Sequence, residues 1–453
     1  MYFRNKECPI TLLAVRCPEK LGGAMNIEEL VTEGFTGVSR KAFVDEEIFR
    51  LEQEQIFKKC WLFLGHVSQI KQPGDFFTGY MGEEPVIVTR DQENHINVFV
   101  NSCRHRGMRV CRADRGHARH FSCSYHAWTY DLTGKLLGVP RQKEGYYEEL
   151  DVSQRGLISA AKVDEYKGLI FATFDPEAVS LLDYLGNMGW YMDLILDRHE
   201  GGTELVTGIH KWRVKTNWKL PCDNNAGDWY HVGTAHGSMA RLNGNPNLFA
   251  ENENRIGVSA EYGHTLCAMY HPEGKHAVSP PHHPKEMAQW QNEVWSNAHT
   301  RLGTTRSRLE FVAGNVFPNF SWIPGSFSIR QYHPRGIDEV EIWSYCLVDA
   351  DAPRIVKDQM RRHYTDTFGP SGLLEQDDGE NWHGCFETAG NPVIRKIPFS
   401  YEMGHGHEWK DEKLRAKDVA KATSEVYQRS FYRRWYEQLS AETDEVELIA
   451  RGA

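Results

Sequence analysis

Two short segments of the chain each carry one cysteine and one histidine. They read Cys-Arg-His from residue 103 and, after 17 further residues, Cys-Ser-Tyr-His from residue 123. Thiolates and neutral imidazoles both bind iron and zinc. Because each segment offers one ligand of each kind, the pattern suits a two-iron cluster in which the cysteines hold one iron and the histidines hold the other. The predicted ligands are Cys103, His105, Cys123 and His126.

A structural zinc site is the alternative for these four residues. Zinc fingers usually bring two cysteines together in one hairpin and two histidines in the other. Here both segments mix the two ligand types, and Gly107 and Trp128 nearby are small and aromatic residues that suit the cover of a cluster. We therefore favour the two-iron cluster, of the Rieske type, which relays electrons. Cys111 is expected to be a buried apolar residue.

A second metal site is suggested by His231 and His236, which are five residues apart. In a helix they would lie on broadly the same side, and a local bend would complete their convergence. Two imidazoles and a carboxylate form the facial triad of non-haem Fe(II) oxygenases, with open positions for dioxygen and substrate. The acidic run that follows residue 368 offers a carboxylate, but composition leaves four alternatives open. They are Glu375, Asp377, Asp378 and Glu380.

These segments need elements to hold them. Apolar residues at helical spacing predict a helix over residues 42–60. From there to about residue 174, short apolar runs between glycines predict a small antiparallel β domain. Beyond residue 180, helices alternate with strands predicted at 316–323, 327–332 and 340–348, and a last helix is predicted over 413–439. The expected fold class is therefore α+β, with an all-β domain inserted into the rest.

Composition sets limits on the function. The 453 residues have 52 Lys or Arg and 62 Asp or Glu, a net charge of −10, and 40% are apolar, enough for the cores of two or three domains. The absence of a long basic block argues against nucleic-acid binding, and no apolar run is long enough for a membrane span. Ten scattered cysteines do not form a disulfide scaffold, so we expect a cytoplasmic protein.

The order and spacing of these motifs resemble the α subunits of bacterial aromatic ring-hydroxylating dioxygenases, especially those acting on naphthalene and biphenyl. The resemblance rests on the Cys/His segments, on the stretch from Asn-Trp-Lys at 217 to His236, and on the stretch from Phe-Gly-Pro at 368 to Asp-Asp at 377. It covers about residues 40–440. It implies an extension and helical part of the catalytic domain at 1–59, a Rieske domain at 60–180, and a helix-grip catalytic domain of antiparallel sheet and helices at 181–453.

The resemblance also implies which residues act. Asp378 would complete the mononuclear iron site beside His231 and His236. Asp228 would link the two metal sites, with Tyr125 near that link, and Asn224 is a further catalytic candidate.

The expected partners follow from the same resemblance. Electrons from NADH would arrive through a reductase and a ferredoxin. They would cross from the cluster of one protomer, through His126, to the iron of its neighbour, through Asp228. The expected assembly is an α3β3 hexamer with a small β subunit, or an α3 trimer.

The expected reaction is addition of both atoms of O2 to a small aromatic substrate as a cis-dihydrodiol. A monohydroxylase of an aromatic acid such as a salicylate is the alternative enzyme, and a Rieske electron carrier is the alternative that is not an enzyme. By approximate alignment the resemblance places eight residues around the substrate, and Asn225 and Leu374 predict a wider, more polar pocket. The eight are Asn225, Val232, Phe311, Ala313, Ile323, Ser326, Phe368 and Leu374.

Overall fold

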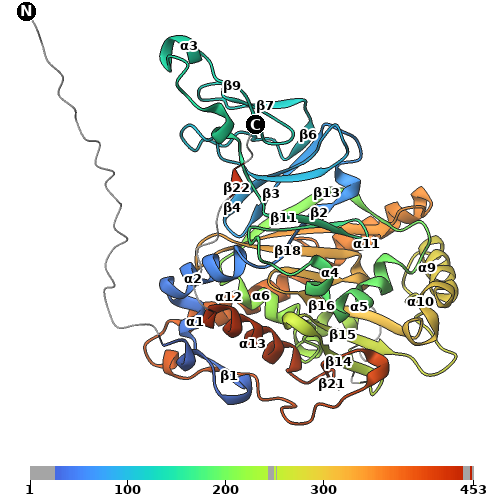
Figure 1. The fold of residues 1–453 in the computed structure, drawn as a ribbon. Helices are drawn as coiled ribbons and strands as arrows, with labels where there is room; N and C mark the ends of the chain where they lie inside the picture. Colours follow the sequence, from blue (N-terminus) through green and yellow to red (C-terminus); the bar gives the residue numbers. More distant parts are fainter. Residues whose placement is uncertain (1–25, 243–248, 251, 442–448, 451–453) are drawn as a thin grey trace, which may run out of the picture.

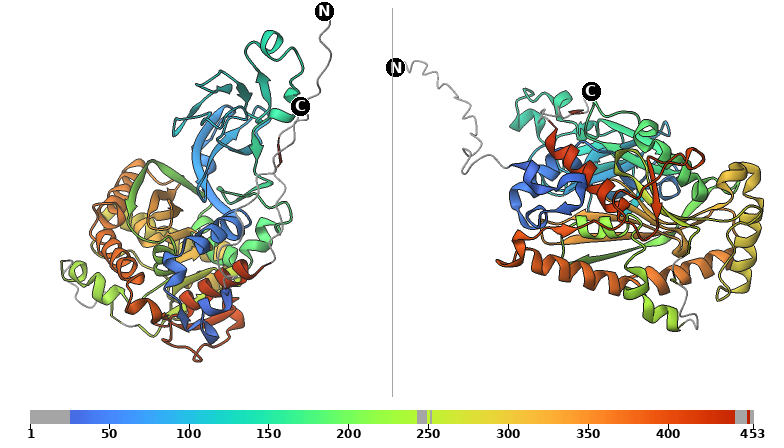
Figure 2. Two further views of the ribbon diagram at one scale, coloured as in Figure 1. Left: turned by 90° about the vertical axis from the view of Figure 1, so that its left-hand side faces the viewer. Right: turned by 90° about the horizontal axis from the view of Figure 1, so that it is seen from below.

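The fold is known from a computed structural model, which describes residues 26–242, 249–250, 252–441 and 449–450. Figure 1 shows an upper part made mostly of strands and loops with the short helix α3 (Gln142–Gly145), which carries both Cys/His segments, and a larger lower part of sheet and helices. The quarter turn in the left panel of Figure 2 shows the same separation. The chain is therefore α+β with an all-β domain inserted, as predicted. Its exact domain limits stay a prediction.

The upper part, here called the cluster domain, contains three antiparallel sheets. The largest has the order β22-β10-β5-β4-β3-β6, with β22 and β10 formed by Ile449–Ala450 and Ile158–Ser159. Its other strands are β5 (Ile96–Val100), β4 (Glu84–Arg90), β3 (Asp75–Met81) and β6 (Arg115–His117). The two smaller sheets are β11 (Lys162–Tyr166), β12 (Leu169–Thr173) and β2 (Leu62–His66), and β7 (His120–Ser122), β8 (Thr129–Asp131) and β9 (Leu136–Gly138).

The catalytic domain is built on one eight-stranded antiparallel sheet, ordered β13-β19-β18-β17-β16-β15-β14-β21. Helix α13 (Val426–Ser440) contacts strands β14 and β15, and helix α11 (Arg354–Phe368) contacts β19. The strands are β13 (Thr203–Val214), β19 (Val340–Asp349), β18 (Ser328–Pro334), β17 (Phe320–Ile323), β16 (Leu309–Val316), β15 (Thr265–Tyr270), β14 (Arg255–Ser259) and β21 (Asp418–Lys421).

Helices surround this sheet, and in the described ranges none is long and apolar enough to cross a bilayer. Strands β1 (Gly37–Val38) and β20 (Phe399–Ser400) pair beside them. The remaining helices of this domain are α1 (Lys41–Val44), α2 (Glu46–Glu52), α4 (Leu181–Leu185), α5 (Asn187–Leu196), α6 (Lys219–Asn224), α7 (Val232–Ala235), α8 (Gly237–Leu242), α9 (Lys285–Asn297), α10 (His299–Arg306) and α12 (Glu375–Ala389).

A buried carboxylate fixes helix α6, which leads into the histidine pair. Glu52, at the end of α2, accepts hydrogen bonds from the indole nitrogens of Trp218 and Trp435, each at 2.7 Å, and from Lys219 Nζ at 2.5 Å. Glu52 and Lys219 are both fully buried. Buried charges are tolerated when their partners satisfy them. This network therefore ties α2, α6 and α13 into one unit.

The two domains share a hydrophobic core where β2 and β12 meet the catalytic sheet. The ring of Phe63 stacks on that of Phe320 with centroids 4.0 Å apart, and Phe171 meets both rings edge-on. All three side chains are buried. The cluster domain has a second, smaller core of its own, which includes both ligand cysteines and Trp128. The shared core therefore packs the two domains against each other.

Two sequence predictions of elements are wrong in extent. Residues 316–323 form a strand end, a turn and a second strand, because Pro318 cannot donate to a sheet ladder. The last helix begins at Val426 rather than Lys413, since the left-handed backbone of Arg415 (φ 46°) breaks a helix and residues 418–421 pair with β14. The helix predicted at 42–60 is present in pieces, with Asp45 capping α2.

Candidate metal centres

The two Cys/His segments form loops with the same backbone hydrogen bonds. In the first loop, the Cys103 N–H donates to Met108 O at 2.9 Å and the Gly107 N–H donates to Cys103 O at 2.9 Å. In the second loop, Cys123 bonds Trp128 and Ala127 bonds Cys123 in the same way, at 2.8 and 2.9 Å. Gly107 and Ala127 occupy equivalent left-handed positions, with φ of 74° and 56°. The sequence thus folds into two matching ligand loops.

The loops place like ligands together. His105 Nδ1 lies 3.1 Å from His126 Nδ1, and the thiols of Cys103 and Cys123 are close enough to interact. Both cysteines are buried, and burial raises the pKa of the Cys103 thiol, an effect that Cys123 adds to. A cation beside the sulfurs would reverse this by stabilising the thiolates. Two thiols on one side and two facing imidazole nitrogens on the other fit a [2Fe-2S] cluster of the Rieske type.

Tyr130 is a contact of the cluster loops that the sequence reasoning missed. Its hydroxyl lies 3.3 Å from Cys103 Sγ and accepts a hydrogen bond from the Arg104 N–H at 3.0 Å. Burial raises the pKa of Tyr130, so the hydroxyl keeps its proton and can donate it toward the sulfur. Hydrogen bonds to cluster sulfurs are one of the factors that set the reduction potential.

We expect Tyr130→Phe to lower the potential of the cluster by about 40 mV. The lost hydrogen bond contributes about 1 kcal/mol, and a tenfold change in a one-electron equilibrium corresponds to about 59 mV. Redox titration followed by the EPR signal of the reduced cluster measures the shift. Tyr146→Phe is the matched control, because Tyr146 packs edge-on against Trp128, with centroids 6.4 Å apart, in the same domain. An equal shift in both variants would contradict a specific role for the Tyr130 hydroxyl.

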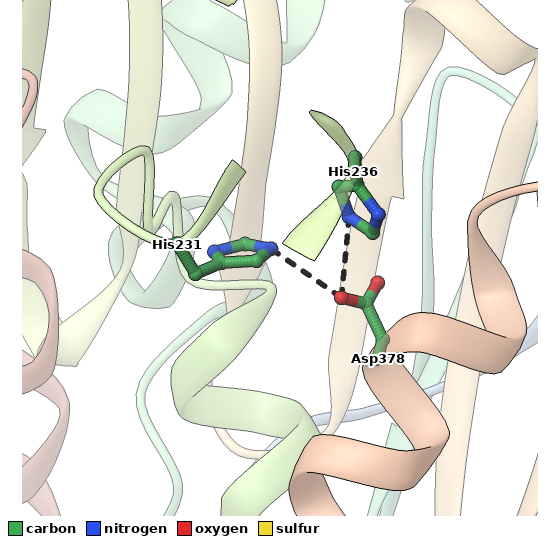
Figure 3. Close-up of side chains that lie close together, drawn as sticks. All are labelled: His231, His236 and Asp378. Carbon is green, nitrogen blue, oxygen red and sulfur yellow. Dashed lines mark ion pairs between the residues drawn. The ribbon is translucent and has the colours of Figure 1, made fainter. Parts of the chain in front are cut away.

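The second group of predicted ligands comes together in the catalytic domain. Figure 3 shows His231, His236 and Asp378 converging, with the histidines flanking the single turn of α7 and the aspartate on α12. Nε2 of His231 and Nε2 of His236 lie 3.3 and 3.2 Å from Asp378 Oδ1. One ligand atom from each residue lies within 4.8 Å of the others. A single turn of helix therefore achieves the convergence that the spacing predicted.

The donor set of this site fits a divalent metal. Asp378 Oδ1 is buried and has no hydrogen-bond donor among the described residues. Burial alone would raise the pKa of Asp378, but the two imidazoles lower it to about 2. Burial alone would lower the pKa of His231, but Asp228 and Asp378 raise it to about 10. The raised pKa of His231 describes a proton held between the imidazoles and the carboxylate. A bound Fe(II) would replace that proton and would be coordinated by all three ligand atoms.

A carboxylate orients each histidine from behind. Asp228 Oδ2 lies 3.1 Å from His231 Nδ1, and Asp377 Oδ2 lies 3.2 Å from His236 Nδ1. Each carboxylate holds a proton on Nδ1 and leaves the Nε2 lone pair for a metal. Sequence reasoning considered Asp377 only as a possible ligand. The only sequence signal for the orienting role of Asp377 was its position next to Asp378.

Asn224 lies beside His231, the histidine that Asp228 contacts. Its amide nitrogen lies 3.1 Å from His231 Nδ1, and its amide oxygen accepts a hydrogen bond from Trp382 Nε1 at 3.0 Å. Trp382 is on α12, the helix of Asp378, so this contact links the two halves of the site. Asn224, Asp228, His231 and Asp378 all line one cavity of about 440 Å³.

A tight turn between α11 and α12 brings the acidic run to the histidines. A Cβ atom on Gly369 would lie 2.5 Å from Thr365 O, and one on Gly372 would lie 2.3 Å from Thr367 O. Such contacts are too short for any side chain, so the turn requires glycine at both places. This explains the Phe-Gly-Pro-Ser-Gly motif in physical terms.

The predicted pocket residues divide into groups. Ile323, Phe368 and Leu374 form one buried cluster with Met239, and the ring of Phe368 lies edge-on to His236 with centroids 6.3 Å apart. Val232 is buried on α7 between the two histidines.

The other four have different surroundings. Phe311 packs beside Trp322 and lines a separate cavity of about 70 Å³. Ala313 pairs with Cys267 across β15 and β16, and Ser326 is buried in the turn after β17. Asn225 donates its amide to Pro221 O at 3.0 Å, so that group is already engaged.

Comparison with known proteins gives consistent matches along the chain. The sequence matches the family "Ring hydroxylating alpha subunit (catalytic domain)" over residues 189–441 and the family "Rieske [2Fe-2S] domain" over residues 60–166. It is 38% identical over 443 residues to the biphenyl 2,3-dioxygenase subunit alpha of Rhodococcus jostii (strain RHA1), covering 94% of this chain and 95% of that protein.

Other relatives agree with this match. Identity is also 38%, over 427 residues, with the benzene 1,2-dioxygenase subunit alpha of Pseudomonas putida, covering 92% and 94% of the two chains. Naphthalene 1,2-dioxygenase with indole bound in its active site superposes with a TM-score of 0.85 at 31% identity, covering 92% of this chain and 95% of the other.

Proposed function

Because the chain belongs to the ring-hydroxylating α-subunit family, we propose that His231, His236 and Asp378 bind its catalytic iron and that Cys103, His105, Cys123 and His126 bind its cluster. The protein is an oxidoreductase that adds O2 to an aromatic ring. The observation that carries the ligand assignment is that one ligand atom from each of these three residues lies within 4.8 Å of the other two, with a carboxylate behind each histidine.

The reaction consumes electrons and protons along with O2. Addition of both oxygen atoms to a ring double bond takes up two electrons and two protons and leaves a cis-dihydrodiol. When bound, the [2Fe-2S] cluster supplies electrons and the mononuclear Fe(II) activates dioxygen. Asp228 and Asp377 hold protons on the Nδ1 atoms of the two histidines. Ile323, Phe368 and Leu374 form an apolar wall that excludes water near His236.

The enzyme needs an aromatic substrate, O2 and an electron-transfer partner. We propose that a ferredoxin or a reductase component delivers the electrons and that these electrons come from NADH. We also propose that the protein acts in the cytoplasm. We further propose an α3β3 or α3 assembly in which electrons pass from His126 of one protomer to Asp228 of the next.

The placement of the two centres supports this route. Within one chain the cluster loops lie in the upper domain and α12 lies in the lower one (Figure 1). Tyr125 beside His126 is 58% exposed, and Tyr230 beside Asp228 is 59% exposed. Each centre therefore has an aromatic neighbour at the surface, where a second protomer can contact it.

Product analysis tests the proposed reaction. Purified protein with its redox partners, given naphthalene, biphenyl, benzoate and salicylate under ¹⁸O2, should form a cis-dihydrodiol that carries both labelled atoms. A product with one labelled atom, formed only from the aromatic acids, would instead support the monohydroxylase. Electron uptake without any product would support a Rieske carrier, which would require neither the catalytic-domain match nor the ligand triad.

Leu374→Trp should narrow the range of substrates. Leu374 is buried against Ile323 and Phe368, so an indole at this position would reduce the room for substrate in the proposed pocket near His236. We expect kcat/KM for biphenyl to fall about tenfold or more relative to that for benzene. The control is Leu373→Trp at the neighbouring position, which is 53% exposed and should leave the ratio unchanged. An unchanged ratio in Leu374→Trp would place this residue outside the pocket.

A further inference from the structure

An arginine is buried in the middle of the catalytic sheet, behind the helix that carries Asp378. Arg330 lies on β18, between β17 and β19, and is 0% exposed. Its Nη2 lies 2.5 Å from Glu375 Oε2, and the Glu375 side chain is 3% exposed. Glu375 is the first residue of α12. The sheet is thereby joined to the start of that helix through a buried ion pair.

The same guanidinium also holds the end of the preceding helix. Arg330 Nη2 donates to Phe368 O at 3.0 Å, and its cation lies 4.9 Å from the centre of the Phe368 ring. Phe368 is the last residue of α11. Arg330 therefore contacts both sides of the glycine turn between α11 and α12. Both contacts are made by one nitrogen, Nη2, which the rigid, planar guanidinium holds in a fixed direction, whereas the ammonium of a lysine is a point charge on a flexible stem.

The Arg330–Glu375 contact lies close to the proposed metal ligand Asp378 along helix α12. Glu375 and Asp378 are three residues apart, which places them on one face of α12. A shift of the first turn of α12 would move the Asp378 carboxylate with it. The site depends on such small distances, because Asp378 Oδ1 lies within 3.3 Å of both histidine nitrogens.

The ion pair is not arranged for stability alone. Nη1 of Arg330 and both carboxylate oxygens of Glu375 are buried and have no hydrogen-bond partner in the ranges the structure describes, so Nη2 and Oε2 meet as an ion pair without hydrogen-bond geometry. Incompletely satisfied buried charges add little stability compared with apolar side chains of similar volume. The Arg330–Glu375 ion pair instead fixes the position of the turn between α11 and α12.

We propose that Arg330 is a positioning residue for the iron site: by bridging Phe368 O and Glu375 it fixes the α11–α12 turn and thus the Asp378 carboxylate. Through Phe368, whose ring faces His236, it also fixes one wall of the substrate pocket. The proposal rests on the iron ligands given under Proposed function.

The test measures binding of Fe(II) alone to full-length protein that holds its cluster but lacks mononuclear iron, by competition with a chelator. Arg330→Lys keeps the charge but loses the planar group that holds Nη2 between Phe368 O and Glu375, and we expect about tenfold weaker Fe(II) binding. In Arg330→Met/Glu375→Leu an apolar pair replaces the ion pair. We expect its thermal midpoint and cluster absorbance to match the parent while Fe(II) binds ten- to a hundredfold more weakly, roughly the range for lost supporting contacts.

Arg335→Met is the matched control. Arg335 follows β18 and is also ion-paired, with Nε 2.7 Å from Glu341, and stacked on a ring, that of Tyr80 at 3.7 Å. The Arg335→Met protein should bind Fe(II) with the affinity of the parent protein. Parent-like affinity in both Arg330 variants would overturn the positioning role, as would equal losses in Arg335→Met. Asp378→Ala separates the two proposals: if it keeps full Fe(II) affinity, the ligand assignment itself fails.

Discussion

Asp378→Ala should abolish ring hydroxylation and lower the bound iron from about three atoms per chain to about two, the number held by a Rieske cluster. The visible absorbance of the cluster should persist, because the cluster loops lie in the other domain. In the proposed site the carboxylate would supply the third ligand atom beside two imidazoles, and its loss would leave too few ligands for Fe(II). Metal analysis, absorbance and product formation on the same preparation measure the three effects.

The control for this prediction is Glu380→Ala, two residues further along α12. Glu380 is exposed, so this variant should keep its iron and activity. An active, iron-loaded Asp378→Ala would contradict the assignment. In that case Asp377 or Glu380 would be the next candidate ligand.

Asp228→Asn should stop electron transfer while both metal sites stay filled. The substitution keeps the shape of the side chain but removes the charge that faces His231 Nδ1 at 3.1 Å. A carboxylate there orients the imidazole and stabilises positive charge, and an amide does so poorly. In a single turnover, the pre-reduced variant should keep its cluster reduced after substrate and O2 are added. Product yield should fall at least tenfold.

Asp377→Asn is the matched control, because it removes the equivalent carboxylate from His236. Asp377→Asn should likewise keep both metal sites filled, but it should allow cluster oxidation. If Asp228→Asn reoxidised its cluster normally with full product yield, Asp228 would have no part in the transfer. If both variants lost transfer equally, the effect would belong to ligand orientation rather than to the route of the electron.

Much of the site could be predicted from local sequence because its ligands sit in short segments. The Cys/His loops each close within six residues, and His231 and His236 are separated by one helical turn. The third ligand could not be chosen from the residues alone, since four carboxylates share one run. Three-dimensional contacts separate them: Glu375 faces Arg330, Asp377 faces His236, and Asp378 faces both Nε2 atoms.

The misplaced start of the last helix has a non-local cause in addition to the local break at Arg415. Leu414 and Val419 fit a helical face in the sequence, but Val419 pairs with Val258 as part of an edge strand. Such pairing depends on a partner about 160 residues away, which local periodicity does not reveal. Arg330 was missed for the same reason, because its two acceptors become its neighbours only after the sheet and two helices assemble.

The stacked rings of Phe63 and Phe320 have a kinetic consequence. The shared core would have to open before the cluster domain could swing toward the iron of its own chain, so the proposed route would make electron transfer a property of the oligomer rather than of the single subunit. Catalysis would then depend on mass action: on dilution below the dissociation constant of the assembly, the rate per chain would decline, although each chain remained folded with its metals bound.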